Sequence, residues 1–208
     1  MIAYLLLVNV SRMFSSMPGL AGGMARDIRD GNLKKYIIQP LDLIGYLLSY
    51  RVAHKCVYIV TSALPYAVLF ALCYSFFDSL PNPITFVAYL ASLILAFLVG
   101  FFFEVCIGMV GFWLLVVSSI LYVIMTLNYF TSGHMFPLTL LAEPWPTILM
   151  LLPMQYLAYF PAAVFLGKIQ GWDLVWGLAG GVAWAIVLML LARQLYRTGL
   201  RRYSAFGG

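Results

Sequence analysis

Charged side chains are scarce in this chain of 208 residues. Asp, Glu, Lys and Arg together make up 9% of it, whereas about 25% is usual in soluble domains. Hydrophobic residues make up 64%, and several apolar runs reach the roughly 20 residues that a helix needs to cross a bilayer. This composition excludes a soluble globular domain and predicts an all-α, polytopic, integral membrane protein.

Cysteine is also scarce, and a phosphate-binding loop is lacking. Cys56, Cys73 and Cys106 fall inside apolar stretches without paired spacing, which is typical of small buried hydrophobic residues rather than of disulfides or metal ligands. No G-x-x-x-x-G-K-[ST] motif occurs, so any ATP chemistry would have to come from another chain.

The tripeptide Ser132-Gly133-His134 is the only sequence that suggests an intramembrane enzyme. Side chains two positions apart on a helix do not face one another, and no second metal ligand lies near His134 in the sequence. The sequence therefore predicts no catalytic, cofactor-binding or metal-binding residue in this chain.

The basic residues gather in two regions of the sequence. Seven lie in or near positions 28–40, namely Arg12, Arg26, Arg29, Lys34, Lys35, Arg51 and Lys55, and four lie near the C-terminus, namely Arg193, Arg197, Arg201 and Arg202. Basic residues that flank apolar spans follow the positive-inside rule and contact anionic headgroups. The net charge of +5 therefore indicates a membrane surface rather than nucleic acid, and segments 26–55 and 193–208 are predicted to be cytoplasmic.

The apolar runs predict five membrane crossings: one in 2–24, one in 57–76, two in 84–132 and one in 174–192. The run 84–132 would be about 73 Å long as one helix at 1.5 Å per residue, so it must fold back once. We expect the hairpin between Glu104 and Gly111, because this stretch holds a charge and glycines.

Segment 135–167 contains five prolines, each of which tends to break a helix: Pro137, Pro144, Pro146, Pro153 and Pro161. An even number of crossings must separate the two cytoplasmic regions, and 57–76, 84–132 and 174–192 already supply four. A further crossing in 135–167 would make the number odd, so this segment is predicted to be a re-entrant helical element on the outer face. Such irregular backbone is tolerated at membrane depth only when protein or a cavity surrounds it. The same parity places Met1 outside, which suggests that a cytoplasmic segment and one more helix normally precede it.

Within the first cytoplasmic region, the sequence predicts a short helix over 33–38, with Asn32 as its N-cap and Pro40 ending it. Its apolar positions recur at i, i+3 and i+4 and form one stripe of Leu33, Tyr36 and Ile37. Asp42 is expected to cap the next helix. An ordinary interfacial helix and a helix that binds a cytoplasmic partner both fit this pattern.

Three blocks of the sequence, in this order, resemble ABC-2 type permeases, the membrane subunits of ATP-binding-cassette exporters. The first is R-D-I-R-D followed by G-x-L-x-x-x-I-x-x-P at 26–40, and the second is Y-L-A-Y-F-P-A-A-V-F-L-G at 156–167. The third is G-L-R-R-Y at 199–203 with the final G-G. Family members usually begin with a cytoplasmic helix and a first span, which this sequence does not show.

The resemblance implies one transmembrane permease domain over 1–208, in the plasma or inner membrane, that exports an unidentified, possibly hydrophobic substrate. It implies a homodimer or heterodimer of permeases that work with two ATPase subunits, which carry the ATP. Segment 26–55 would be the coupling loop, and its ATPase-coupling residues would be Arg26, Asp27, Gly31, Leu33, Tyr36, Ile37 and Pro40. The alternative is a membrane scaffold or assembly factor without transport.

Arg12 and Glu104 are ionisable residues within apolar spans, which makes each a functional-site hypothesis. Both are candidates for lining a transport pathway. Glu104 could instead meet water or a basic neighbour at the cytoplasmic membrane edge, or pair with Arg12. Arg12 could snorkel, face a protein cavity, or contact a helix that precedes this sequence.

Overall fold

The computed structural model describes residues 1–39, 41–77, 81–114 and 118–203, and every regular element in these ranges is a helix. The longer helices are α1 (Ile2–Ser15), α2 (Leu20–Arg29), α4 (Leu43–Leu72), α5 (Pro83–Met109), α6 (Ser118–Thr131) and α9 (Gly171–Tyr203). The short ones are α3 (Lys34–Ile37), α7 (Trp145–Leu151), α8 (Tyr159–Phe165) and the 3₁₀ turns η1 (Tyr74–Phe76), η2 (Val110–Phe112), η3 (Leu138–Leu140) and η4 (Pro153–Leu157). The prediction of an all-α polytopic membrane protein is confirmed.

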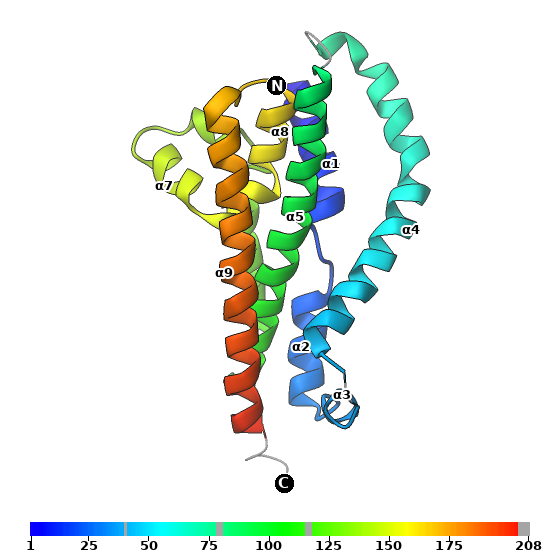
Figure 1. The fold of residues 1–208 in the computed structure, drawn as a ribbon, viewed down its shortest axis with the longest axis vertical. Coiled ribbons are helices and arrows are strands. Elements are labelled where there is room, and N and C mark those ends of the chain that lie inside the picture. The colour runs from blue at the N-terminus through cyan, green and yellow to red at the C-terminus, as the bar shows by residue number, and fades with distance from the viewer. Residues whose placement is uncertain (40, 78–80, 115–117, 204–208) are drawn as a thin grey trace.

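Within the described residues, three helical segments are long and apolar enough to cross a membrane: Leu43–Leu72, Pro83–Phe112 and Gly171–Tyr203. α1 and α6 contain 14 residues each, which is about 21 Å of helix and less than a bilayer core of about 30 Å. α1 and α2 follow one another along the long axis beside α5 (Figure 1). The count of five crossings therefore stays a prediction.

α5 is the central helix and packs against α1, α2, α8 and α9 (Figure 1). Glycines let neighbouring backbones approach it closely. A Cβ on Gly100 would lie 2.4 Å from the carbonyl oxygen of Ser15, and a Cβ on Gly108 would lie 3.0 Å from Cα of Ala21. Helices in lipid associate without a hydrophobic driving force, and small residues allow the close van der Waals packing that holds them together instead.

The hairpin expected between Glu104 and Gly111 is wrong. α5 continues through Glu104 to Met109, and η2 extends it to Phe112. The two glycines of this stretch do not make a turn but allow contact with α2, since Gly111 lies against Ala25 as Gly108 lies against Ala21. The charge that suggested a loop is hydrogen-bonded inside the bundle, as described below.

α4 stands apart from the rest of the molecule. It begins at Leu43, where Leu43 and Ile44 are buried, and leans away from α5 over most of its length (Figure 1). Val60 and Leu64 in its middle are each 75% exposed. The helix that Asp42 caps is continuous with the span that follows it, so the predicted coupling loop 26–55 would include the first 13 residues of α4, up to Lys55.

The proline-rich segment 135–167 is divided into the short elements η3, α7, η4 and α8, as its prolines predict. α7 and α8 have seven residues each, about 10 Å of helix, so neither can cross a bilayer. α8 is buried, with Phe160 and Ala162 almost fully enclosed. It lies at the same end of the molecule as the N-terminus (Figure 1).

Candidate functional site

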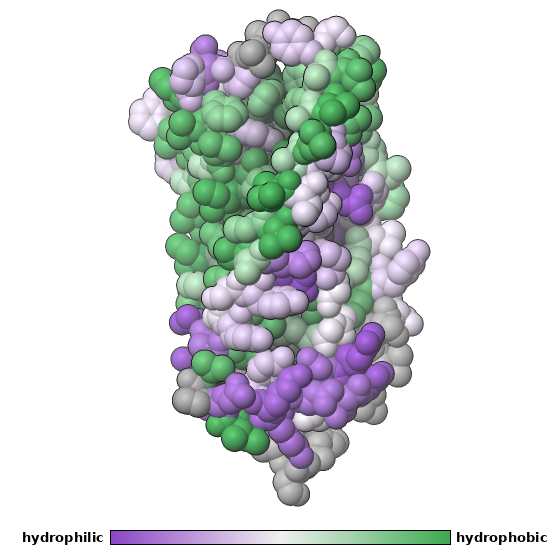
Figure 2. All heavy atoms as spheres, turned by 90° about the vertical axis from the view of Figure 1, so that its right-hand side faces the viewer, coloured by the Kyte–Doolittle hydropathy of each residue, from purple (hydrophilic) through white to green (hydrophobic). Residues whose placement is uncertain are grey.

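The broadest hydrophilic band on the face drawn in Figure 2 lies near one end of the molecule. α3 and the C-terminal end of α9 lie at this end, opposite the N-terminus (Figure 1). Figure 2 shows a broad hydrophilic band there and a mostly hydrophobic surface above it. Arg29 and Lys34 of the first basic region and Arg202 of the second line one hollow at this end, whereas Arg12 and Lys55 lie elsewhere in the bundle.

The apolar residues predicted to form one stripe on the coupling helix point in different directions. Leu33 is 3% exposed and belongs to the hydrophobic core, and Tyr36 is half-buried with its ring 5.7 Å from that of Tyr46. Ile37 is 45% exposed and Ile38 is 82% exposed. The apolar surface that α3 exposes is therefore formed by Ile37 and Ile38, because α3 is a single turn that Leu33 anchors to the core.

The other coupling candidates shape the loop around α3. Gly31 has a φ of +75° and makes the turn after α2, and the carbonyl of Asp27 accepts a hydrogen bond from the Leu33 amide at 3.2 Å. Arg26 is exposed on α2. Pro40, the last candidate, lies outside the described residues.

The caps of the two helices differ from each other. The predicted cap at Asn32 is wrong, because α3 begins at Lys34 with Leu33 as its N-cap and no side-chain cap bond. The predicted cap at Asp42 is confirmed, since its carboxylate accepts a hydrogen bond from the amide of Gly45 at 3.3 Å.

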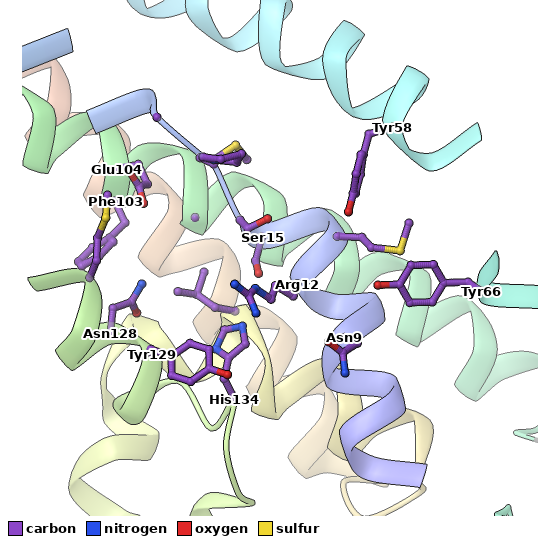
Figure 3. A pocket seen from close by; sticks show the side chains of 18 residues that line it. Asn9, Arg12, Ser15, Tyr58, Tyr66, Phe103, Glu104, Asn128, Tyr129 and His134 are labelled. Carbon is purple, nitrogen blue, oxygen red and sulfur yellow. The ribbon is translucent and has the colours of Figure 1, made fainter. Parts of the chain in front are cut away.

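A cavity of about 520 Å³ lies between α1, α4, α5, α6 and η4 (Figure 3). Arg12 of α1 and Glu104 of α5 both line it. Glu104 belongs to the segment Pro83–Phe112, which is long and apolar enough to cross a membrane, so the cavity lies beside this segment. The structure therefore brings the two predicted pathway residues to one site.

Glu104 stabilises the start of α2. Its Oε2 accepts a hydrogen bond from the Ala21 amide at 3.3 Å. The first amides of a helix lack intrahelical partners, and Gly19, the N-cap residue of α2, has no side chain to supply one. A carboxylate from α5 thus takes the role of a capping side chain. Both Arg12 and Glu104 are described, and no ion pair joins them.

Lys55 has a structural role that the sequence analysis missed. It is buried, and its Nζ donates hydrogen bonds to the carbonyl of Ser16 at 2.6 Å and to the carbonyl of Met13. These carbonyls lie at the C-terminal end of α1, where partners are missing and a cation is favourable. The sequence signal that could have suggested this role was Pro18-Gly19. These residues break the helix, so the last carbonyl groups of α1 need a donor from elsewhere.

Ser132 and His134 do contact each other, contrary to the expectation from helical spacing. α6 ends at Thr131 and Gly133 has a φ of +81°, so the Ser132 Oγ lies 2.5 Å from Nδ1 of His134. Ser132 is fully buried. The His134 ring stacks on the Tyr129 ring, with 5.1 Å between the ring centroids. The guanidinium carbon of Arg12 lies 5.6 Å from the centroid of the Tyr129 ring.

This arrangement does not favour a hydrolase. A serine nucleophile needs access to substrate and a base that an acidic group orients. Ser132 has no access, and the charged neighbour on the Tyr129–His134 stack is the cation Arg12. The cluster instead joins α1 to the end of α6, together with the 2.6 Å hydrogen bond from the Tyr4 hydroxyl to the carbonyl of Gly133.

Comparison with known proteins identifies the family. The sequence profile described as "ABC-2 family transporter protein" matches residues 1–207. No curated protein and no solved structure matches the chain. The match covers all the helices described above and the three blocks that suggested the resemblance, except for the last residue, Gly208. The chain therefore belongs to the ABC-2 family of transporter proteins, and it is a multi-pass membrane permease component of an ABC transporter, not itself an ATPase.

Proposed function

We propose that this permease exports its substrate and that it is driven by a separate ATPase subunit which binds at α3. Two permease chains, identical or related, would work with two ATPase subunits. The family match supports association with an ABC ATPase subunit. The direction of transport, the coupling site and the dimer are the proposal.

The observation that carries this proposal is the exposed apolar pair at the hydrophilic end. Ile37 and Ile38 are presented to solvent between the basic residues Lys34 and Lys35 and the start of α4. An apolar pair of this kind on a charged surface is typical of a contact that another protein covers. Leu33, which lies in the core, would transmit a displacement of α3 to the bundle.

Co-purification with the ATPase tests the coupling site. The chain is co-expressed with an ATP-binding-cassette ATPase encoded beside it, and the complex is purified through a tag on the permease. We expect Ile38→Asp to abolish co-purification, because it places a charge in an apolar contact. Thr198→Asp is the matched control, since Thr198 is an exposed residue of α9 at the same end.

Two results would contradict the proposal. If the unaltered chain does not bind the ATPase, the alternative of a membrane scaffold is favoured. If Ile38→Asp binds as well as Thr198→Asp, the ATPase docks elsewhere. Leu33→Asp is a poor probe, because Leu33 is buried and its substitution would damage the fold whatever its role in coupling.

Cysteine labelling tests the orientation. In a variant without Cys56, Cys73 and Cys106, single cysteines replace the exposed residues Glu143, Gln170 or Lys34. We expect an impermeant maleimide added to intact cells to label positions 143 and 170 but not 34. The reverse pattern would show that α3 faces away from the cytoplasm, where no ATPase could reach it.

A further inference from the structure

Arg12 is a cation at membrane depth without a carboxylate partner in the described part of the chain. It lies one turn before Ser15, whose carbonyl oxygen faces Gly100 near the middle of the apolar segment Pro83–Phe112. Its side chain is exposed, and its one described contact with a ring is the face of Tyr129. A charge in this position is costly unless an anion or water accompanies it.

Glu104 does not fill this role, although it lines the same cavity. Its carboxylate accepts the hydrogen bond from the amide of Ala21, and no ion pair joins it to Arg12. The cavity therefore has two separate polar regions. One is the Glu104 cap of α2, and the other surrounds Arg12.

Several neutral polar side chains converge on the region around Arg12. Asn9 lies one turn before it on α1, and Tyr58 and Tyr66 extend from α4 toward α1 (Figure 3). The Oδ1 atom of Asn128 is buried and has no hydrogen-bond partner. A buried polar atom without a partner costs about 1 to 3 kcal/mol, so a ligand in the cavity that donates a hydrogen bond to this atom would be favoured.

Part of the cavity lining is apolar. Met17 of the segment between α1 and α2, Phe103 of α5 and Met125 of α6 contribute to it. Methionine and aromatic side chains adapt to alkyl chains of different shape. Because Arg12, Asn9 and Tyr129 are exposed, the cavity is open at the side of the bundle, where a molecule dissolved in the bilayer could enter.

We propose that this cavity binds an acidic amphipathic molecule, with its anionic head at Arg12, a donor group of the head at Asn128, and its alkyl chain along Met17, Phe103 and Met125. The inference rests on the proposed function, since the ligand is taken to be the transported substrate. The site lies within one protomer, so binding requires neither the ATPase nor a second permease chain.

Binding of simple amphiphiles to the purified full chain tests this site. The probe is dodecyl phosphate, the zwitterionic control with the same alkyl chain is dodecylphosphocholine, and inorganic phosphate tests the head group alone. We expect only dodecyl phosphate to bind in a manner that depends on Arg12. Arg12→Gln should weaken its binding at least tenfold, whereas Arg12→Lys should retain most of it, because a charged donor to phosphate persists.

Further variants separate loss of the site from loss of the fold. Arg193→Gln removes an exposed arginine of α9 outside the cavity and should bind as the unaltered chain does. Asn128→Asp is nearly isosteric, and it should also weaken binding at least tenfold because it places a carboxylate beside the anion. This second variant keeps the test decisive if Arg12→Gln does not fold.

The source of the ligand is decided by native mass spectrometry with added phosphatidylglycerol. Retention of this lipid by the unaltered chain and its loss in Arg12→Gln would identify a two-chain lipid, and binding of dodecyl phosphate alone would identify a single-chain solute. Equal binding by the unaltered chain, Arg12→Gln and Asn128→Asp would overturn the proposal, as would equally strong binding of inorganic phosphate. The assay contains no ATPase, so its failure is distinct from failure of the coupling proposal.

Discussion

α4 and α5 are similar in sequence character but opposite in environment. Both provide a helical segment of 30 residues that is apolar enough to cross a membrane. In the most apolar stretch of each, 72% of the α5 residues are buried but only 6% of the α4 residues. Apolarity therefore identifies which segments cross a membrane but does not show which of them form the core.

The difference follows from small residues at the helix contacts. α5 has Gly100 and Gly108 where the backbones of the α1–α2 pair approach, and Leu95 of α5 lies against Gly181 of α9. α4 contains one glycine, Gly45, which lies in its first turn against its own cap Asp42. α4 is joined to the bundle at its start by Leu43 and Ile44 and before its midpoint by Lys55, and beyond Lys55 its side chains are mostly exposed.

Truncation of one leucine in each helix gives the most direct test of this contrast. Leu93 of α5 is 3% exposed and Leu64 of α4 is 75% exposed. We expect Leu93→Ala to lower the free energy of unfolding by about 3 kcal/mol, because it leaves a cavity in the core. Leu64→Ala should change it by less than about 0.5 kcal/mol. Equal losses in thermal unfolding of the detergent-solubilised monomer would show that α4 is packed.

The close approach of α1 to α5 is tested by adding a single methyl group. Gly100→Ala should cost between about 2 and 3 kcal/mol, since the new Cβ would meet a backbone oxygen that cannot move aside easily. Gly23 on α2 has nothing within 4 Å of an added Cβ, and Gly23→Ala should be neutral or stabilising by about 0.5 kcal/mol. A Gly100→Ala protein as stable as Gly23→Ala would contradict the close contact.

The attachment of α4 is tested by removing its buried cation. Lys55→Met keeps the length of the side chain but leaves the carbonyls of Met13 and Ser16 without their donor. We expect a loss of about 2 kcal/mol and a larger distance between spin labels on α1 and α4. Lys168→Met, at an exposed position outside the bundle, should have no effect on either measurement.

The smallest expected effect concerns the cap on α2. Glu104→Ala should cost about 1 kcal/mol, because the amide of Ala21 loses its acceptor. Glu104→Gln should cost less, since its amide oxygen can still accept that hydrogen bond. If thermal unfolding shows the same loss for both variants, the charge of Glu104 matters more than its hydrogen bond.

The coarse architecture could be predicted because hydropathy, proline and charge act locally. Length and apolarity predicted the spans in α4, α5 and α9, and the prolines predicted the short elements between Met135 and Gly167. Asp42 was recognisable as a cap because capping depends on residues three positions apart. The family could be recognised from three short blocks, and its match over residues 1–207 confirmed it.

The predictions that failed depended either on contacts between distant segments or on local backbone turns. Glu104 and the glycines after it resembled a turn, yet their partners are Ala21 and Ala25, about 80 residues earlier. Leu33 belonged to an apolar stripe in sequence, but it lies in the core. Ser132 and His134 meet because a left-handed glycine ends α6, which helical spacing could not indicate.

By itself the sequence determined that this is an all-α membrane permease of the ABC-2 family, since composition and short motifs require no knowledge of what lies nearby in space. Only the tertiary structure decided that α5 rather than α4 forms the core, that Lys55 is buried, and that Arg12 and Glu104 share one cavity but have different surroundings. The physical reason is that apolarity is a property of each residue, whereas burial and hydrogen-bond partners are properties of pairs that the chain brings together when it folds.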